Sequence, residues 1–325
     1  MAYTTIDDPT IHFNTVLFTG TASGNKAVTG VGFQPDWVWT KNRVDAYGHN
    51  LYDSVRGVGK YLNSNESAAE STSATSMVSF DSDGFTVGTG DNVQYSSNNG
   101  VSWNWLASNT TASNTDGSIT STVSANTTAG FSIVSWTGTG ANATIGHGLG
   151  AEPKMIFLKI RTGTNNWQVY NKSIGSGNAL FLNTTDASGS NTGWQSTDAT
   201  SSVFYVSGGT AVNGSGASLI AYCFAEKKGY SKIGSYTGNG NTDGIFVYTG
   251  FKPAWVMIKN SSHARDWIMM DNKRDPDNVV SNRIFPNNTD AQNTNNDMLD
   301  FTSNGFKIRN TNTTANLNGG TYIYM

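Results

Sequence analysis

A frame of eleven residues occurs three times in this chain, and an internal repeat constrains a fold more than any single motif does. The copies are GFQPDWVWTKN at 32–42, GAEPKMIFLKI at 150–160 and GFKPAWVMIKN at 250–260. Each copy has glycine at its first position, proline at its fourth and lysine at its tenth. The chain is therefore expected to consist of repeated units of one kind.

The segments around this frame also recur in a fixed order. Before it stand NTVLFTG, SIVSWTG and SKIGSYTG, and after it stand HNLYDSV, NWQVYNKS and DWIMMDNK. Each copy closes with a short apolar run, which is VSWNWLA, LIAYCFA or TYIYM. Aligning the copies gives units of about a hundred residues, which we expect at 1–108, 129–228 and 229–325.

A polar segment separates the first two of these units. Residues 109–128 are mostly Ser, Thr, Asn, Ala and Gly, and Ile119 is the one bulky side chain that stands out among them. Such a composition is typical of a flexible or extended linker. We therefore expect a polar linker at 109–128.

Each unit contains about seven or eight short segments of alternating apolar and polar residues, separated by Gly, Asn, Asp and Ser. This pattern is typical of an antiparallel β-sandwich or jelly roll. Asp-Gly in SDGF (82–85) and Asn-Gly in SNGF (303–306) predict hairpin turns, because these residues tolerate positive φ. Asn65 to Ser71 is the best candidate for a helical turn. The predicted fold class is all-β, with three tandem β-sandwich or jelly-roll-like units.

The repeated frame predicts a strand that is apolar on both faces. Successive side chains of a strand point to opposite faces, so Trp37 and Trp39 share one face and Val38 and Thr40 the other. The two other copies are apolar on both faces as well. One face is expected to be the core of the sandwich. The other requires a cover, which could be a loop of the same unit, a neighbouring unit or another chain.

Composition excludes several classes of protein. The net charge is −3 and no cluster of Lys and Arg forms a basic stripe, which argues against nucleic acid as a partner. No apolar run approaches the ~18 residues of a membrane span, which predicts no membrane insertion. The single cysteine, Cys223, allows no intramolecular disulfide. The start, MAYTTIDDPT, is not that of a secretory signal, so synthesis and folding are expected in the cytosol.

Two short motifs suggest ligand chemistry and are better explained by loops. Asp81 to Gly84 has the Asp-x-Asp-Gly pattern of a calcium loop, but no acidic residue follows at the required spacing, which favours a plain hairpin turn. Arg56 to Lys60 (RGVGK) could hold a phosphate through glycine amides and two cations. No strand-to-helix context follows it, so a solvated loop is favoured.

The histidines and the cysteine offer no consistent site. His12, His49, His147 and His263 occupy different places in the units and lack metal-ligand spacing. His263 to Asp266, with Ser261 or Ser262, contains the residue types of a catalytic triad, but such residues normally converge from separate elements. Cys223 is expected to be a small buried apolar residue. We therefore predict no catalytic, metal or cofactor site and no cofactor.

Several long strings resemble those of a known family. GFQPDWVWTKNR, LYDSVRGVGKYLNSN, SFDSDGFTVG and AYCFAEKKGYSKIGSYTGNGN are similar to segments of an uncharacterised bacteriophage virion-protein family, common in marine and cyanobacterial phages. The resemblance covers essentially the whole chain. It implies a structural role in the virion, as a tail-fibre, tail-associated or capsid-decorating protein that contacts other virion proteins. Relatives run on past TYIYM, so the last strand, at Thr321 to Met325, is expected to be cut short.

Three functional classes follow from these observations. The first is a non-enzymatic structural protein of the virion that mediates assembly or contact with the host surface. The second is a carbohydrate-binding module for a host surface glycan, because aromatic side chains on a β-sandwich can stack on sugar rings. The third is a glycan depolymerase, which would require a pair of carboxylates that the repeats do not contain. The doubly apolar strands and the unfinished last strand further predict a homo-oligomer, with a trimer favoured by the resemblance.

Overall fold

The computed structural model describes residues 4–92, 94 and 98–325, and almost all of its regular structure is antiparallel β-strand. The all-β fold class is therefore confirmed. The helices among these residues are single turns, at η1 (Pro9–Ile11), η3 (Lys172–Ile174), α1 (Thr210–Asn213) and α2 (Thr313–Asn316). None of these helices has the length and apolar character needed to cross a membrane.

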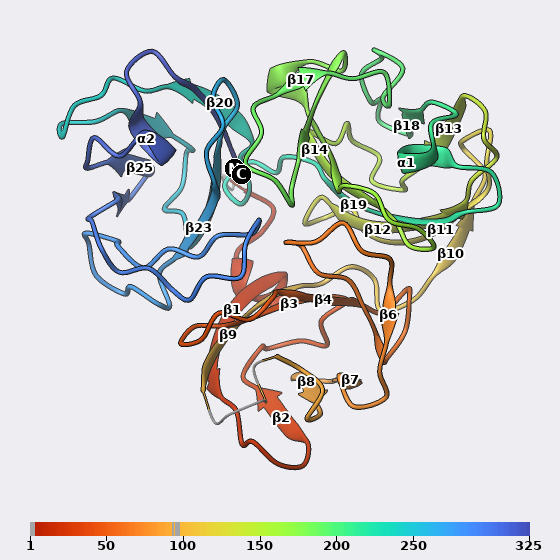
Figure 1. The fold of residues 1–325 in the computed structure, drawn as a ribbon, viewed down its shortest axis with the longest axis horizontal. Coiled ribbons are helices and arrows are strands. Elements are labelled where there is room, and N and C mark those ends of the chain that lie inside the picture. Colours follow the sequence, from red (N-terminus) through yellow and green to blue (C-terminus); the bar gives the residue numbers. More distant parts are fainter. Residues whose placement is uncertain (1–3, 93, 95–97) are drawn as a thin grey trace.

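The strands fall into three lobes (Figure 1). The first lobe contains β1 (Phe13–Thr19), β2 (Lys26–Thr29), β3 (Trp37–Asn42), β4 (Asn50–Asp53), β5 (Lys60–Tyr61), β6 (Ser71–Thr72), β7 (Met77–Asp81), β8 (Gly84–Val87) and β9 (Asn99–Trp105). The second contains β10 (Ala112–Asn114), β11 (Ser121–Asn126), β12 (Phe131–Thr137), β13 (Ala143–Gly146), β14 (Met155–Ile160), β15 (Gln168–Asn171), β16 (Asn178–Phe181), β17 (Gly189–Ser190), β18 (Val203–Val206) and β19 (Ser218–Phe224). The third contains β20 (Gly234–Thr237), β21 (Phe246–Tyr248), β22 (Trp255–Asn260), β23 (Trp267–Asp271), β24 (Leu299–Thr302), β25 (Gly305–Ile308) and β26 (Thr321–Tyr324).

One strand order occurs in all three lobes. The inner sheets run β1-β9-β3-β4, β12-β19-β14-β15 and β20-β26-β22-β23, so the strand from each repeated frame always lies between the last strand of its lobe and the strand that follows the frame. Smaller sheets, β2-β8-β7, β13-β18 and β21-β25-β24, pack on the outer side of each inner sheet. The first lobe and the third are thus sandwiches of a four-stranded and a three-stranded sheet. The exact boundaries of the repeated units remain a prediction.

The inner faces of the three sheets meet in one shared core (Figure 1). Trp37 and Trp39 of β3, Met155 and Phe157 of β14, and Met257 of β22 all belong to this core and are fully or almost fully buried. Burying each large apolar side chain contributes about 1.5 to 3 kcal/mol. The cover that the sequence required for the second face of these strands is therefore supplied by the neighbouring lobes of the same chain.

The opposite face of each frame strand forms the core of its own lobe. Val38 packs with Val28 and Phe85 across the first sandwich. Ile156 and Leu158 do the same in the second lobe, and Val256 and Ile258 in the third. The alternation read from the sequence thus assigned these side chains to the correct faces.

The segment at 109–128, predicted as a flexible or extended polar linker, is extended and belongs to the large sheet of the second lobe. β10 and β11 lie in this segment, and β11 pairs with β12 from Thr122 opposite Ser135 to Asn126 opposite Phe131. The small polar side chains are compatible with a strand because they find hydrogen-bond partners. The Ser121 hydroxyl, for example, donates to the Gly146 carbonyl at 2.8 Å.

The helical turn considered at Asn65 to Ser71 is also absent from the structure. This segment is largely an irregular loop, and its backbone forms hydrogen bonds with the second lobe. The Glu70 amide donates to the Arg161 carbonyl at 2.8 Å, and the Asn165 amide donates to the Ser67 carbonyl at 3.0 Å. A tertiary contact has therefore outweighed a weak local preference.

Both predicted hairpins form; Gly84 has the positive φ expected, at 148°, and both glycines are required for a second reason. Asp81 pairs with Gly84 and Thr302 with Gly305, so the turns lie between these residues. A Cβ at Gly84 would lie 2.0 Å from the Val28 carbonyl oxygen, and one at Gly305 would lie 2.1 Å from the Val247 carbonyl oxygen. The glycines thus allow the neighbouring strand to approach closely.

The last strand is not the open edge that the sequence analysis expected. β26 lies between β20 and β22 and pairs with both of them. Met325 continues the pairing, because its amide and carbonyl bond those of Met257 at 3.0 and 2.8 Å. A homo-oligomer was expected because an apolar face would be exposed to water and because the strand at 321–324 would be unpaired. In the structure other parts of the same chain cover this face and pair with this strand, so neither reason holds. The trimer stays a prediction that rests on the resemblance alone.

The shared core predicts that the lobes unfold together. Trp37→Ala removes a ring that contacts side chains of two lobes, so we expect a loss of about 3 to 5 kcal/mol in the free energy of unfolding. Urea unfolding followed by circular dichroism measures this loss and should show one transition for the parent chain. The control is Tyr248→Ala, at an exposed aromatic residue, which should change the free energy by less than about 0.5 kcal/mol. Separate transitions for the lobes would contradict the prediction.

Candidate binding site

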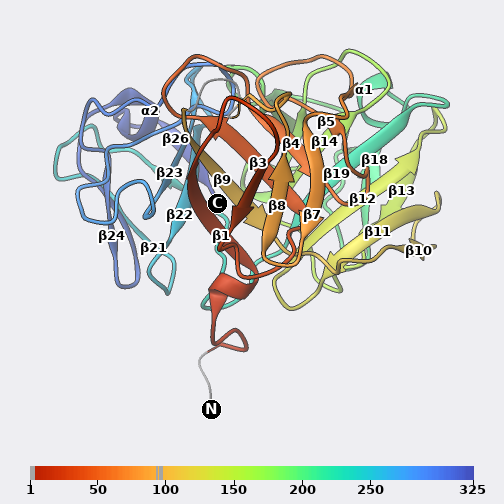
Figure 2. The ribbon, with the colours of Figure 1, turned by 90° about the horizontal axis from the view of Figure 1, so that it is seen from below.

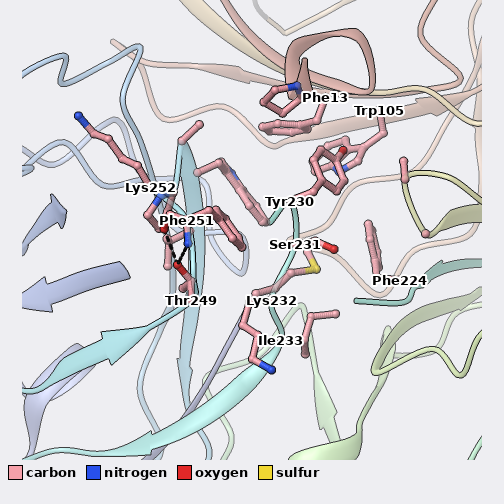
Figure 3. Close-up of a pocket in the computed structure, with 18 of the residues that line it drawn as sticks. Phe13, Trp105, Phe224, Tyr230, Ser231, Lys232, Ile233, Thr249, Phe251 and Lys252 are labelled. Carbon is pink, nitrogen blue, oxygen red and sulfur yellow. Dashed lines mark hydrogen bonds between the residues drawn. The ribbon is translucent and has the colours of Figure 1, made fainter. Parts of the chain in front are cut away.

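One candidate site is a half-open cavity of about 410 Å³ at one end of the shared core (Figure 3). It lies between the start of β1, the end of β9, the start of β22 and the segment that joins β19 to β20. Figure 2 shows η1 at this side of the first lobe, beneath β1, and Pro9 and Thr10 line the cavity. All three lobes thus contribute to its wall.

Aromatic side chains from all three lobes contribute to this wall. Their rings include those of Phe13, Trp105, Phe224, Tyr230, Phe251 and Trp255. Trp105 meets Trp255 edge to face with ring centroids 5.8 Å apart, and Phe13 lies 4.8 Å from Trp105. Such arrangements are those that aromatic pairs prefer. The site is therefore a preformed apolar surface with fixed ring orientations.

The polar side chains of the cavity include lysines, several Ser, Thr and Asn residues and the Trp255 indole. Lys232, Lys252 and Lys273 contribute to its lining, whereas no Asp, Glu, His or Cys is among the described residues that line it. The buried Nε1 of Trp255 has no hydrogen-bond partner in the described part of the chain. A buried indole N–H usually finds an acceptor. The cavity thus favours binding an apolar group that brings an acceptor or a negative charge with it.

The lysines that close the three frames form a ring of contacts between the lobes. Lys41 donates to the Thr289 carbonyl at 3.2 Å, Lys159 to the Ser67 carbonyl at 3.1 Å and Lys259 to the Thr185 carbonyl at 2.8 Å. Each lysine therefore reaches into a different lobe from its own. Burial lowers the pKa of each of these ammonium groups to about 8. The sequence showed the three lysines in register but gave no sign of these partners.

A second set of hydrogen bonds joins the same pairs of lobes as the lysine contacts. The Trp167 indole donates to the Asn63 carbonyl and the Trp267 indole to the Phe181 carbonyl, both at 2.9 Å. His49 takes the corresponding role in the first lobe, with Nε2 at 3.0 Å from the Phe285 carbonyl oxygen. Its Nδ1 accepts from Trp39 at 2.7 Å, so Nε2 carries the proton. Burial holds the pKa of His49 well below its usual value, which assigns it a structural role.

The basic loop at 56–60 is not the solvated loop that the sequence favoured, because Arg56 is buried. Arg56 is buried, pairs with Asp53 and donates to the Tyr222 hydroxyl of the second lobe at 3.2 Å. The third lobe repeats the arrangement, since Arg274 pairs with Asp271 at 2.6 Å and Trp103 of the first lobe donates to that carboxylate at 3.0 Å. The Arg56 guanidinium is therefore already used within the chain.

The Asp-x-Asp-Gly motif behaves as a turn. The Asp83 carboxylate accepts the amides of Gly30 at 3.0 Å and Gly32 at 2.7 Å, and these bonds lower its pKa. Asp81 accepts from the Thr86 hydroxyl at 2.7 Å. The two carboxylates thus serve different neighbours. In the described residues, no group of three or more His, Cys, Asp or Glu side chains is placed to hold a metal ion.

The residues considered for a triad do not assemble into one. Ser262 and His263 lie 3.0 Å apart between Oγ and Nδ1 on the surface, but Asp266 accepts from the Asn287 amide at 2.7 Å. Ser261 donates to the Thr321 carbonyl at 3.1 Å. The carboxylate that a triad needs to orient its histidine is thus engaged elsewhere.

The other single residues are spread over the fold. His12 contacts Asn126 at 3.2 Å and His147 contacts the Thr200 carbonyl at 3.2 Å, and burial lowers the pKa of both imidazoles. Cys223 is buried in the core of the second lobe, where burial raises the pKa of its thiol. None of these residues lines the cavity.

The structure is thus that of an all-β protein of three lobes around a shared core, with a cavity where the lobes meet. The family model described as "Domain of unknown function (DUF7483)" matches residues 8–325, so the chain belongs to this family. The comparisons with curated proteins and with solved structures found no match.

The lysine ring predicts an unusual dependence of stability on pH. The pKa of each lysine is lower in the folded state, about 8, than its ordinary value of 10.5, so the unfolded chain binds more protons between these values. Stability therefore rises with pH above about 8. The raised pKa of the buried Cys223 thiol opposes this above its ordinary value of 9, equally in every lysine variant, and the raised pKa values of buried tyrosines oppose it above 10, so the useful window is about pH 7.5 to 9.5.

Single replacements test this prediction. Lys41→Met, Lys159→Met and Lys259→Met should each remove about one third of the slope of unfolding free energy against pH, because the three lysines contribute alike. Urea unfolding at several pH values between 7.5 and 9.5 measures the slope. Lys26→Met, at a lysine on β2 outside the ring, is the matched control. Equal slopes for all four variants would contradict the assignment.

Proposed function

We propose that this protein is a non-enzymatic structural protein of a bacteriophage virion, placed in a tail fibre, another part of the tail or on the capsid. Its role is assembly or contact with the host surface, with other virion proteins as partners and with synthesis in the host cytoplasm. The observation that best supports the proposal is which groups the buried polar side chains contact. They hold lobes to one another instead of converging on a reactive centre.

The cross-lobe contacts support a mechanical role. Each of the lysines 41, 159 and 259 is inserted into another lobe, and the bonds of Trp167, Trp267 and His49 repeat this pattern. Glu70 of the first lobe adds an ion pair with Arg161 of the second at 2.8 Å. A chain closed in this way resists separation of its lobes without a disulfide. The resemblance of the strings around the repeated frame to virion proteins supports the same proposal.

Purified particles test the proposal directly. In a phage that encodes this protein, mass spectrometry of particles purified through a density gradient should detect it at a fixed number of copies per particle. Immunogold labelling should place it at one position, either on the tail or on the capsid. A protein found in the infected lysate but removed by particle purification would overturn the structural role.

A carbohydrate-binding function is the second candidate, and one observation favours it. Phe246 and Tyr248 lie on the same face of β21 and are 43% and 61% exposed. Phe246 extends over Gly305 of the next strand, where an added Cβ would lie 3.0 Å from its ring. Two neighbouring exposed rings on a sheet edge form a surface on which sugar rings can stack.

Titration of host surface polysaccharide onto the protein tests this second function. If the two rings bind sugar, Phe246→Ala and Tyr248→Ala should each weaken binding about tenfold, the loss of one aromatic contact. Val58→Ala, at an exposed apolar residue of the first lobe, is the control. Unchanged binding in both ring variants would exclude this surface. Release of reducing ends from the polysaccharide would instead support the depolymerase.

A further inference from the structure

One position recurs at the boundaries between lobes. The Glu70 amide of the first lobe donates to the Arg161 carbonyl of the second at 2.8 Å. The Gln292 amide of the third lobe donates to the Arg43 carbonyl of the first at 3.0 Å. In both cases the carbonyl that accepts from the frame lysine lies three residues earlier in the chain. Glu70 and Gln292 are therefore equivalent residues at two boundaries.

At the boundary of the first and second lobes, the Glu70 carboxylate joins two guanidinium groups. It accepts from Arg161 through Nε at 2.8 Å and Nη2 at 2.9 Å, and from Nη1 of Arg56 at 3.3 Å. Nε of Arg56 pairs with Asp53, and Nη2 donates to the Leu51 carbonyl at 2.7 Å. One carboxylate thus holds two lobes together and balances the charge of a buried arginine.

The third lobe repeats the buried arginine but not its acceptor. Arg274 donates to Asp271 at 2.6 Å and to the Met269 carbonyl at 3.0 Å, so its side chain is held as that of Arg56 is. Its side chain is fully buried. Nη1, the atom that in Arg56 donates to Glu70, has no hydrogen-bond partner among the described residues of the third boundary. A buried donor of this kind is costly to leave unpaired, so Nη1 marks a place for an acceptor.

Gln292 does not replace the carboxylate. Its Oε1 accepts from Nε of Arg43 at 2.8 Å, but its Nε2 is a donor and bonds Asn282 at 2.6 Å. The Nη atoms of Arg43 form no hydrogen bond within the described part of the chain, whereas Nη2 of the equivalent Arg161 is bonded. Burial, and next the charge of Arg274, lower the pKa of Arg43. Two guanidinium groups therefore lie close together without a shared acceptor.

The nearby carboxylate of Asp275 does not supply this acceptor. It accepts from the amides of Ser281 and Asn282 at 2.8 and 2.6 Å, and also from the side chain of Asn282. All three bonds lie within the third lobe. Among the described residues, no ion pair joins Asp275 to either arginine. The unused donors of Arg43 and Arg274 therefore need an acceptor from outside the chain.

We propose that a small inorganic anion binds between Arg43 and Arg274 and fastens the third lobe to the first. The anion accepts from Nη1 of Arg274 and from the Nη atoms of Arg43. It performs there the role that the Glu70 carboxylate performs at the neighbouring boundary. Bonds from a guanidinium to an anion are roughly twice as strong as bonds between neutral groups, so the ion stabilises the closed arrangement of the lobes.

The surroundings favour chloride over larger anions. Arg274 is buried, and the side chain of Gln292 already occupies part of the space that a carboxylate group takes in the equivalent site. An ion of one atom can approach both guanidinium groups beside it. Arg43 and Gln292 are only half-buried, so the ion has a path from solvent. A carboxylate on a partner protein would need to bring its backbone into this boundary.

Melting temperatures in sodium chloride and in sodium gluconate of equal ionic strength test the proposal. Gluconate serves as the bulky anion. The parent chain should melt about 2 to 4 °C higher in chloride, at about ten times the dissociation constant, because the ion binds only the folded state. Gln292→Glu supplies a fixed carboxylate, so this variant should melt equally in both salts and above the parent in gluconate. Equal chloride effects in parent and variant would overturn the proposal.

The reverse change at the neighbouring boundary provides a second test. Glu70→Gln gives Arg56 and Arg161 the surroundings that Arg274 and Arg43 have. This variant should melt at a lower temperature than the parent in gluconate, and its gain from chloride should be about twice that of the parent. A gain no larger than that of the parent would contradict the equivalence of the two sites.

The width of the chloride NMR resonance measures binding without reference to stability. The parent chain should broaden this resonance, because bound chloride exchanges with free chloride. Gln292→Glu should remove most of the broadening. Equal broadening by parent and variant would show that chloride binds elsewhere on the protein and that the proposed site is wrong.

Discussion

The packing of Trp37 against the second lobe is the interaction on which the rest of the structure depends. Its ring stacks on Tyr222 with centroids 4.3 Å apart and contacts Trp105 at 4.4 Å. Each inner sheet presents an apolar face that its own outer sheet cannot cover. The lobes are therefore not independent sandwiches, because each one completes the burial of the others. This shared burial explains why every copy of the frame has large apolar residues on both faces.

The polar contacts between lobes follow from the same burial. A carbonyl group that becomes inaccessible to water at a lobe boundary needs a donor, and an unsatisfied one costs about 1 to 3 kcal/mol. The lysines and indoles supply these donors in a cyclic order. The second lobe departs from this pattern of contacts. Asn171 stands at the position of Asp53 and Asp271, and its buried Nδ2 has no partner in the described residues. Asp53 and Asp271 accept from Tyr222 and Trp103 of another lobe, whereas Met325, which stands at the position of those two donors, has no N–H or O–H in its side chain.

The sequence predicted the features of this protein that depend on local pattern and repeat. The frame strands, the faces of Trp37 and Val38, the hairpins and the all-β class all follow from alternation and turn residues. The segment at 109–128 was misjudged because its strand is held by backbone pairing and by hydroxyl groups, which hydrophobic periodicity does not record. The partners of the buried lysines could not be predicted from the sequence either. Each lysine bonds a backbone carbonyl of a remote segment, and every residue has such a carbonyl whatever its side chain. The cavity was missed for a related reason, because it arises from residues that differ among the copies.

Differences among the lobes also accompany the cavity at the end of the shared core. Ser231 of the third lobe lines it, and Trp105 and Phe224 of the two other lobes contribute rings to its wall. The rigidity of the wall is then supplied by the shared core and not by the ligand. A site of this kind loses little conformational entropy on binding, which favours recognition of one shape over many.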